Sequence, residues 1–413
     1  SNIIPSDPDA FVDRISISSQ IQGWFVTNRK VLVIHGLGGC GKTTIVQHFA
    51  REVVRKQLRK YVWYFDAFRD TEDDALSGIG GLNTDWTDLV IELDPSCACQ
   101  PQVLGNAKSE ALKQLRMQSG SWLFIFDNVP DLDVVRWLVQ DFPWDYGKTI
   151  IISRSQGWTQ GFKNVVPSAI HVEGLEETEA CQLVYERFER FRQYPSETTL
   201  FVTTLCCFPL VIVHALAYCR QPQNRIFSPK DYLKQLDEKG KFNLLIDHNM
   251  ALHSRFPEVV NLQIQTIMSN YTEHFETALR ALKIICLLGE PKFPIQLLEP
   301  ELNIFWILET QSFVQADNKE GWFRIHPLVL ETIRQFFLGN DISSILLIAS
   351  ERLLESLSKL PRKTYGKMRS FQMYQPFLEN ILSEIFKGFC PAKGDEKFDY
   401  FKEVVLRMVR QVD

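Results

Sequence analysis

The amino-acid sequence predicts an α/β domain with a parallel five-stranded sheet, followed by domains that are mainly helical. Short apolar runs between polar turns indicate buried strands at residues 31–34, 61–65, 121–126, 148–153 and 169–172. Segments of helical period separate these runs, and strands joined through helices run parallel. After Leu175 the pattern changes to helical periods with few strands. A ligand of such a sheet binds beyond the carboxyl ends of its strands.

A glycine-rich turn joins the first strand to the first long helical pattern. Gly36, Gly41, Lys42 and Thr43 have the G-x-x-x-x-G-K-[ST] spacing of a phosphate-binding loop. Glycine lets the backbone curl around an anion, and the start of the helix adds partial positive charge. The lysine reaches the β- and γ-phosphates, and the threonine hydroxyl ligates Mg²⁺. The predicted nucleotide-contacting residues of this turn are Gly36, Gly38, Gly39, Cys40, Gly41, Lys42, Thr43 and Thr44.

Polar residues follow two later strands at the same predicted edge of the sheet. Asp127 ends the run at 121–126 and is the candidate that holds Mg²⁺ together with Thr43. Arg154 follows the run at 148–153, where a guanidinium can sense a γ-phosphate; its alternative role is that of a surface residue. Together with Asn128, which follows the acid, Asp127 and Arg154 are the candidates for a role in hydrolysis.

Composition limits the classes of function. The chain has 413 residues, with 45 basic and 50 acidic side chains and a net charge of −5, which argues against nucleic acid as a partner. Nine cysteines at irregular positions indicate free thiols, and Cys97 and Cys99 lack a second ligand pair for a metal. No apolar run reaches transmembrane length, so we expect a cytoplasmic location. Because Ser1 stands where an initiator Met would, we also expect a fragment of a longer protein.

The second half of the sequence predicts two helical domains and a helical tail. Pro209 lies within an apolar helical pattern, where proline starts or kinks a helix. Helical periods from about residue 251, followed by a polar turn between two short apolar runs at 312–316 and 322–325, predict a winged helix. The predicted divisions are a nucleotide-binding α/β domain (1–173), a small helical domain (174–245), a winged-helix domain (246–338) and a C-terminal helical segment (339–413) that resembles the start of a repeat array.

These stretches, in this order, resemble the NB-ARC group of STAND signal-transduction P-loop NTPases. The group includes apoptosome adaptors, plant resistance proteins and relatives coupled to tetratricopeptide repeats. The resemblance extends from about residue 9 to about residue 337. Outside the phosphate loop it rests on residues 11–14 (F-V-D-R), 124–128 (F-I-F-D-N), 153–154 (S-R), 175–183 (L-E-E-T-E-A-C-Q-L), 208–210 (F-P-L) and 324–326 (R-I-H).

The resemblance implies roles for four residues outside the loop. Val12 and Arg14 are expected to lie against the adenine, and Pro209 to pack beside the nucleotide. His326 is expected to bridge from the winged helix to the β-phosphate of ADP and to lock a closed state. A plain structural alternative for this histidine is that it caps the wing.

Three positions depart from the pattern of the group. Asn128 replaces the second acid, which in relatives helps to position or activate water, so hydrolysis here is expected to be slow or absent. Cys207 replaces the glycine before the F-P-L stretch. Pro327 replaces the acid after the histidine, as is common in relatives coupled to tetratricopeptide repeats.

The resemblance implies a nucleotide-dependent switch, at most a slow ATPase, with ADP or ATP and Mg²⁺ as cofactors. ADP would hold a closed resting state, and exchange for ATP would expose oligomerisation surfaces, in signalling of the innate-immunity or cell-death type. The implied partners are further copies of the chain and N-terminal effector and C-terminal sensor regions or partner proteins. Two alternatives stay open: a working ATPase, similar to an origin loader, that binds nucleic acid through the winged helix, and a scaffold that holds nucleotide permanently.

Overall fold

The structure of the chain is a computed structural model. It describes residues 11–67, 81–99, 106–118, 121–129, 147–154, 167–221, 226–239, 256–290, 292–298, 305–316, 321–338 and 342–358, with a few single positions between and after these ranges. The chain divides into two compact units, residues 1–179 and 180–413, and each is described by itself. Within the described residues no helix combines the length and the apolar character that crossing a membrane requires.

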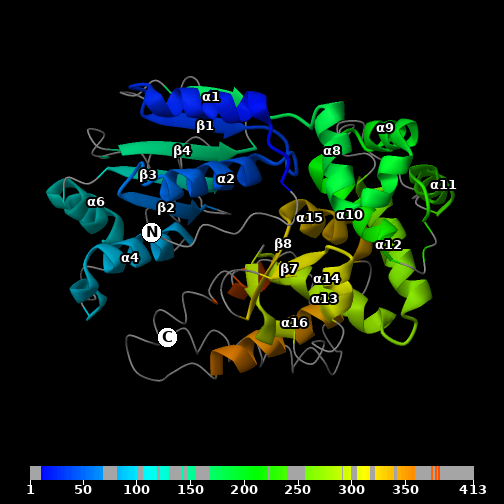
Figure 1. The fold of residues 1–413 in the computed structure, drawn as a ribbon. Helices are drawn as coiled ribbons and strands as arrows, with labels where there is room; N and C mark the ends of the chain where they lie inside the picture. Colours follow the sequence, from blue (N-terminus) through cyan, green and yellow to red (C-terminus); the bar gives the residue numbers. More distant parts are fainter. Residues whose placement is uncertain are drawn as a thin grey trace. The chain divides into compact units, whose positions relative to one another are not determined.

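The first unit contains a five-stranded parallel sheet, as the sequence predicts (Figure 1). Its strands are β1 (Val31–His35), β2 (Tyr61–Asp66), β3 (Trp122–Val129), β4 (Gly147–Ser153) and β5 (Ser168–His171). Their spatial order is β2-β3-β4-β1-β5, so β4 lies between the strand before the phosphate loop and the strand that ends in the acid. The carboxyl ends of all five strands therefore meet at one edge of the sheet.

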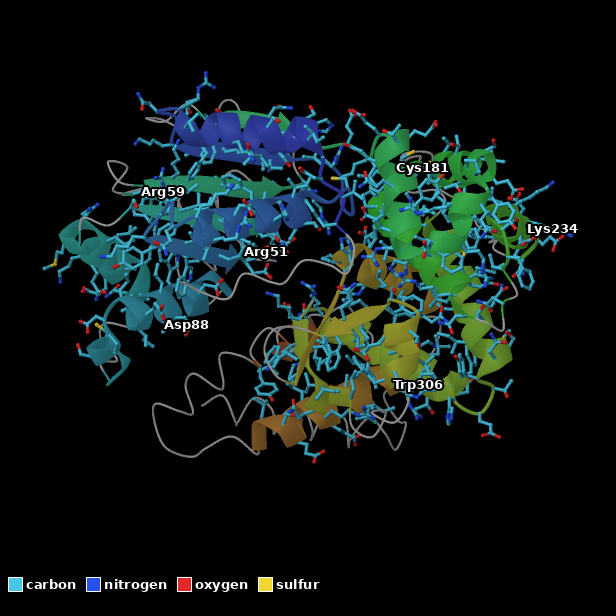
Figure 2. All side chains as sticks on the ribbon, viewed as in Figure 1. Arg51, Arg59, Asp88, Cys181, Lys234 and Trp306 are labelled. Carbon is cyan, nitrogen blue, oxygen red and sulfur yellow. The ribbon has the colours of Figure 1, made fainter. Side chains whose placement is uncertain are left out.

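Helices cover both faces of this sheet, because consecutive residues of β1, β2, β3 and β4 are buried, and side chains of consecutive residues point to opposite faces. On one face, Trp63, Phe65, Phe124 and Phe126 pack with Trp86 in a largely aromatic cluster under α4 (Gly81–Leu93) and α6 (Ala107–Gln118). The other face lies against α1 (Ile15–Val26) and α2 (Lys42–Arg55), which contact each other. After α2, the Arg59 guanidinium lies 4.6 Å from the centroid of the Phe25 ring on α1 (Figure 2).

A buried lysine holds the end of α1 at the opposite edge of the sheet. Lys148, at the start of β4, donates hydrogen bonds from its Nζ to the carbonyl oxygens of Trp24 (3.3 Å), Thr27 (2.7 Å) and Arg29 (2.7 Å). The same ammonium lies 4.6 Å from the centroid of the Trp24 ring. It thereby supplies a donor to carbonyl groups in the last turn of α1 and just after it, where the helix offers no further amides. Burial lowers the pKa of Lys148 to about 8.

The second unit is mainly helical. Its elements are most of α8 (Glu177–Arg187), η3 (Glu189–Gln193), α9 (Pro195–Thr204), α10 (Pro209–Cys219), α11 (Pro229–Lys239), α12 (Phe256–Asn270), α13 (Phe275–Leu288), β6 (Lys292–Pro294), η6 (Ile295–Leu298), α14 (Phe305–Thr310), β7 (Val314–Ala316), β8 (Trp322–Ile325), α15 (Pro327–Phe337) and α16 (Ile342–Ser358). Buried polar side chains join α10, α12 and the residue that follows α14. His214 donates from Nδ1 to Oε1 of Gln263 (2.9 Å), and Gln263 donates to the carbonyl oxygen of Gln311 (2.7 Å).

Of the two roles predicted for Pro209, starting a helix or kinking one, the structure shows the first. α9 ends at Thr204, and α10 begins at Pro209, which occupies its first turn. Between them Cys206 and Cys207 have positive φ angles of 57° and 51°. Because proline has no amide hydrogen and a fixed φ, it is suited to the first turn of a helix and not to its interior.

A small antiparallel sheet follows these helices in the chain. β7 and β8 form the predicted hairpin, and β6, which the sequence pattern did not reveal, pairs with the other side of β8. Most of the hairpin's turn, residues 317–320, lies outside the described residues. The classification of this region as a winged helix and the four domain boundaries stay predictions.

Candidate functional site

The turn after β1 has the backbone geometry of a phosphate-binding loop. Gly36, Gly39 and Gly41 have positive φ angles of 149°, 82° and 93°, which glycine adopts without the penalty that a Cβ atom brings. A Cβ at Gly36 would lie 2.1 Å from the carbonyl oxygen of Val172, so the loop and the chain after β5 are packed backbone to backbone. Such close approach is open to glycine alone.

Lys42 begins α2 and turns back over the loop. Its Nζ donates to the carbonyl oxygens of Gly36 (2.8 Å) and Leu37 (2.7 Å), and the side chain is buried. Burial lowers the pKa of Lys42, while the thiol of Cys40 and the carboxyl of Asp127 oppose that shift. A desolvated ammonium at the start of a helix attracts phosphate strongly, because little bound water must be removed first.

Thr43 and Asp127 meet although 84 positions separate them in the chain. The Thr43 hydroxyl donates to Oδ1 of Asp127 across 3.1 Å, and the hydroxyl of Tyr64 on β2 donates to Oδ2. Tyr64 in turn accepts a hydrogen bond from Nε2 of Gln47 on α2 (3.3 Å). Burial, and secondarily the charge of Asp66, raises the pKa of Asp127 to about 6.

These two oxygen donors fit Mg²⁺. The ion takes hard oxygen ligands and is commonly held by one or two protein groups together with nucleotide phosphates. Among the described residues, no cluster of three or more His, Cys, Asp or Glu side chains has the arrangement of a metal site. Thr43 and Asp127 are thus the residues of this edge that would hold Mg²⁺ jointly with a bound nucleotide, where the ion would neutralise charge on the phosphates.

Strand β4 brings Arg154 to the loop. His35 is in register with Ser153, so the residue after Ser153 leaves the sheet beside the start of the loop. A Cβ built on Gly38 would lie 3.5 Å from both Cζ and Nε of Arg154. The guanidinium predicted to sense a γ-phosphate therefore lies against the loop.

Arg14 is hydrogen-bonded to the backbone of the loop and to the backbone of the segment after β5. Its guanidinium donates to the carbonyl oxygens of Glu173 (3.0 Å), Gly174 (2.8 Å) and, more weakly, Cys40 (3.4 Å). Its Nε lies 3.5 Å from the carboxylate of Glu179. Arg14 thus positions the loop against the segment that leads out of the sheet.

The other predicted residues lie as follows. Val12 is buried near the start of the chain, Thr44 is half-buried in the first turn of α2, and Asn128 follows Asp127 with a positive φ of 58°. Pro209 and His326 belong to the second unit, and their positions are given within that unit. Three residues were not predicted: Gln47, Tyr64 and Asp66. Asp66 carries the signal used for Asp127, an acid at the end of a buried strand.

His326 caps a helix. It precedes α15, and its Nδ1 accepts a hydrogen bond from the amide of Leu328 at 3.1 Å. The structural alternative suggested by the sequence was a cap on the wing; the cap seen here is on the helix that follows β8. A neutral imidazole that accepts at Nδ1 carries its proton on Nε2, so Nε2 is a donor.

A parallel sheet, a glycine loop that ends in Lys42 and Thr43, and an acid on a second strand define a P-loop NTPase. The NB-ARC domain family matches residues 16–190, so this part of the chain is an NB-ARC domain. A domain of this family supports a nucleotide-dependent switch in general terms. No curated protein matches the chain by sequence.

Solved structures resemble the fold at low sequence identity. A signal transduction ATPase with numerous domains (STAND) protein with a tetratricopeptide repeat sensor, from Pyrococcus horikoshii, has a TM-score of 0.54 and 15% identity, over 98% of this chain and 53% of that one. The chain thus spans about half the length of that protein. The Orc1 protein of Aeropyrum pernix in complex with DNA has a TM-score of 0.39 and 11% identity, over 80% of this chain and 94% of that one.

Proposed function

We propose that this switch rests in a closed, ADP-bound state and converts, on exchange of ADP for ATP, to a state that self-associates and signals. The loop amides and Lys42 bind the phosphates, and Thr43 and Asp127 hold Mg²⁺. The observation that carries the proposal is the junction of these groups at the carboxyl edge of the sheet, where Thr43 already donates to Asp127.

Arg154 supports the sensing part of the proposal. Its guanidinium lies against Gly38 of the loop, and a planar cation suits bidentate recognition of a phosphate. A γ-phosphate adds negative charge that ADP lacks. ATP would therefore make a contact with Arg154 that ADP cannot make. A ligand shifts a conformational equilibrium only when it binds one of the two states more tightly, and this contact would provide that difference.

The remaining predicted residues complete the nucleotide site in this proposal. Val12, Arg14 and Pro209 frame the adenine, and His326 donates from Nε2 to the β-phosphate of ADP. The cap on α15 supports the role of His326, because it fixes the tautomer that can donate to an anion. One imidazole can thus cap α15 through Nδ1 and bind the β-phosphate through Nε2.

The wider function rests on the sequence resemblance. We propose a cytoplasmic protein whose active form is an oligomer, in signalling of the innate-immunity or cell-death type. The Pyrococcus protein has a tetratricopeptide repeat sensor, and a comparable sensor, with an effector, would act on this switch as a further region or as a partner protein.

The first experiment identifies the nucleotide that the purified protein carries. The protein is denatured directly after purification, and the released nucleotide is separated by chromatography. We expect ADP at one equivalent per chain. ATP at one equivalent would instead support the permanently loaded scaffold, and protein without nucleotide that turns over added ATP rapidly would support a working ATPase and contradict the switch.

Two variants of His326 separate the latch from the cap. His326→Asn keeps a side-chain oxygen that can cap α15 but removes the imidazole, whereas His326→Ala removes both. We expect both variants to release ADP faster than the wild type, and only His326→Ala to lower the melting temperature as well. Unchanged ADP release in His326→Asn would contradict the latch.

A further inference from the structure

Strand β2 places a second carboxylate beside Asp127. The two strands are parallel and in register, with Asp66 opposite Asp127 at their carboxyl ends. Asp127 is buried, whereas Asp66 is half-buried. The edge that carries the predicted Mg²⁺ site therefore presents two acids on adjacent strands, although the acid expected directly after Asp127 is replaced by Asn128.

An irregularity in β3 turns Asn128 toward this acid. Phe126 pairs with Ile151 and Val129 with Ser153, so two residues of β3 stand opposite one residue of β4. Bulges of this kind re-aim side chains and are frequent beside active sites. Asn128 has a left-handed backbone (φ 58°), and its Nδ2 donates to Oδ1 of Asp66 at 2.9 Å.

The backbone of Asn128 is held as well. Its amide donates to Oδ1 of Asp127 at 2.9 Å, the same oxygen that accepts from the Thr43 hydroxyl. One hydrogen-bonded chain thus runs from the threonine of the phosphate loop through Asp127 and Asn128 to Asp66. An acid and an amide thus lie bonded to each other at this end of the sheet, the acid on β2 and the amide on β3.

We propose that Asp66 supplies the second carboxylate of the hydrolysis site and orients and deprotonates the attacking water. This inference rests on the proposed nucleotide site. The water oxygen forms a bond to the γ-phosphorus, and the bond from that phosphorus to the β–γ bridging oxygen breaks. The electron pair stays on the β-phosphate of the departing ADP. The water proton passes to Asp66 and then to solvent, and Asn128 holds the carboxylate in place.

The test compares Asp66→Asn with a variant in which the two side chains are exchanged, Asp66→Asn with Asn128→Asp. Asparagine at position 66 keeps an oxygen that can accept from Asn128, so folding is expected to survive. With protein in excess over ATP and Mg²⁺, we expect Asp66→Asn to slow ADP formation about 100-fold, the usual minimum for loss of a general base. The exchanged variant should regain the rate to within about tenfold, since one carboxylate faces the water again.

Two readouts other than rate accompany this comparison. The affinity for ATP with Mg²⁺, measured by calorimetry, should change less than about threefold in Asp66→Asn, because an effect on the transition state leaves ground-state binding intact. Purified Asp66→Asn should carry ATP where the wild type carries ADP. Asp94→Asn is the control: Asp94 lies in the same unit, accepts from the amide of Ser96 (2.9 Å), and asparagine can keep that bond.

The outcomes separate this inference from the function on which it rests. An Asp66→Asn variant that hydrolyses ATP at the wild-type rate overturns the role of Asp66 and leaves the switch intact. Wild-type protein that binds nucleotide but forms ADP no faster than free ATP does also overturns it. Wild-type protein that binds no nucleotide overturns the proposed function itself. A loss of rate in Asp94→Asn equal to that in Asp66→Asn contradicts a local role for Asp66.

Discussion

Two buried lysines, one at each end of the strands of the same sheet, make similar hydrogen bonds but have different roles. Lys42 and Lys148 both donate from Nζ to backbone carbonyl oxygens, and burial lowers the pKa of both. Lys148 faces the end of a helix, whereas Lys42 faces a loop of left-handed glycines beside Asp127. A buried lysine is therefore not by itself a sign of a binding site. The backbone around it shows whether the lysine stabilises the fold or faces a ligand. We therefore expect substitutions around Lys42 to change nucleotide binding, and substitutions around Lys148 to change the free energy of unfolding.

Two glycines of this unit give the largest expected contrast. Gly36→Ala places a methyl group 2.1 Å from the carbonyl oxygen of Val172 at a φ of 149°, so we expect a loss of at least about 3 kcal/mol in the free energy of unfolding and loss of nucleotide binding. Gly23, in the exposed middle of α1, has nothing within 4 Å of an added Cβ. Gly23→Ala should therefore stabilise the unit by about 0.5–1 kcal/mol. Denaturant unfolding and calorimetric titration with ADP measure both, and equal effects would contradict the contrast.

The two lysines are compared through methionine substitutions, which keep most of the side-chain volume. Lys42→Met should weaken ADP binding about 100-fold or more, because a charge-assisted contact to phosphate is lost. Lys148→Met should leave ADP affinity unchanged and lower the free energy of unfolding by about 2 to 3 kcal/mol, because buried carbonyl groups lose their donor. If Lys148→Met lost nucleotide and Lys42→Met did not, the assignment of the two edges would be wrong.

Acid should act oppositely on the two units, through Asp127 in the first and His214 in the second. The pKa of Asp127 is raised to about 6, so its contribution to stability grows as the pH falls from about 6 toward the unfolded value. Burial lowers the pKa of His214 to about 4, so its contribution is present near neutral pH and is lost as the pH falls through about 4. Each shift corresponds to roughly 3 kcal/mol.

Hydrogen exchange measured between pH 7 and pH 4.5 can follow β3 and α10 separately in the same sample. We expect exchange from α10, corrected for the intrinsic effect of pH, to accelerate on acidification, and exchange from β3 to slow. The variants Asp127→Asn and His214→Gln serve as controls, because each removes one titrating group. A persistent pH response of α10 in His214→Gln would assign that response to another group.

Tyr64 gives the smallest expected effect. Its hydroxyl donates to Asp127 and thereby opposes the rise in the pKa of that carboxyl. Tyr64→Phe should raise the pKa of Asp127 further and weaken Mg²⁺-dependent ADP binding about three- to tenfold near pH 6, with little change at pH 8. Calorimetric titrations at the two pH values measure this. Equal weakening at both would indicate a change of shape instead of a change of protonation.

The local sequence pattern predicts single strands, helices and loops well, but it predicts poorly which residues of different strands lie beside each other. The parallel sheet and the phosphate loop follow from apolar runs and a spaced motif, because these are properties of single segments. The register that brings Asp66 beside Asp127, and the bulge that turns Asn128 toward it, depend on the pairing of strands distant in the chain. Asp66 ends a buried strand as Asp127 does, and that shared signal would have found it.

Other differences have similar causes. The sequence pattern left open whether Pro209 starts or kinks a helix, because the apolar period continues on both sides of it. β6 was not predicted because it is only three residues long, too short for a visible alternation. Arg14 was expected to lie against the base, and no sequence pattern reveals that its guanidinium also bonds to backbone carbonyl groups after β5. Side chain to backbone bonds of this kind carry no periodic signal.

The packing of Gly36 against Val172 has a mechanical consequence. The two backbones are in contact, the amide of Val172 donates to the carbonyl oxygen of His35 at 2.8 Å, and Arg14 clamps the next two residues. The loop and the start of the segment that leads out of the sheet therefore form one stiff lever. We expect a change in the shape of the loop to move that segment directly, without intervening side chains, because the contact leaves no room for even a methyl group at Gly36.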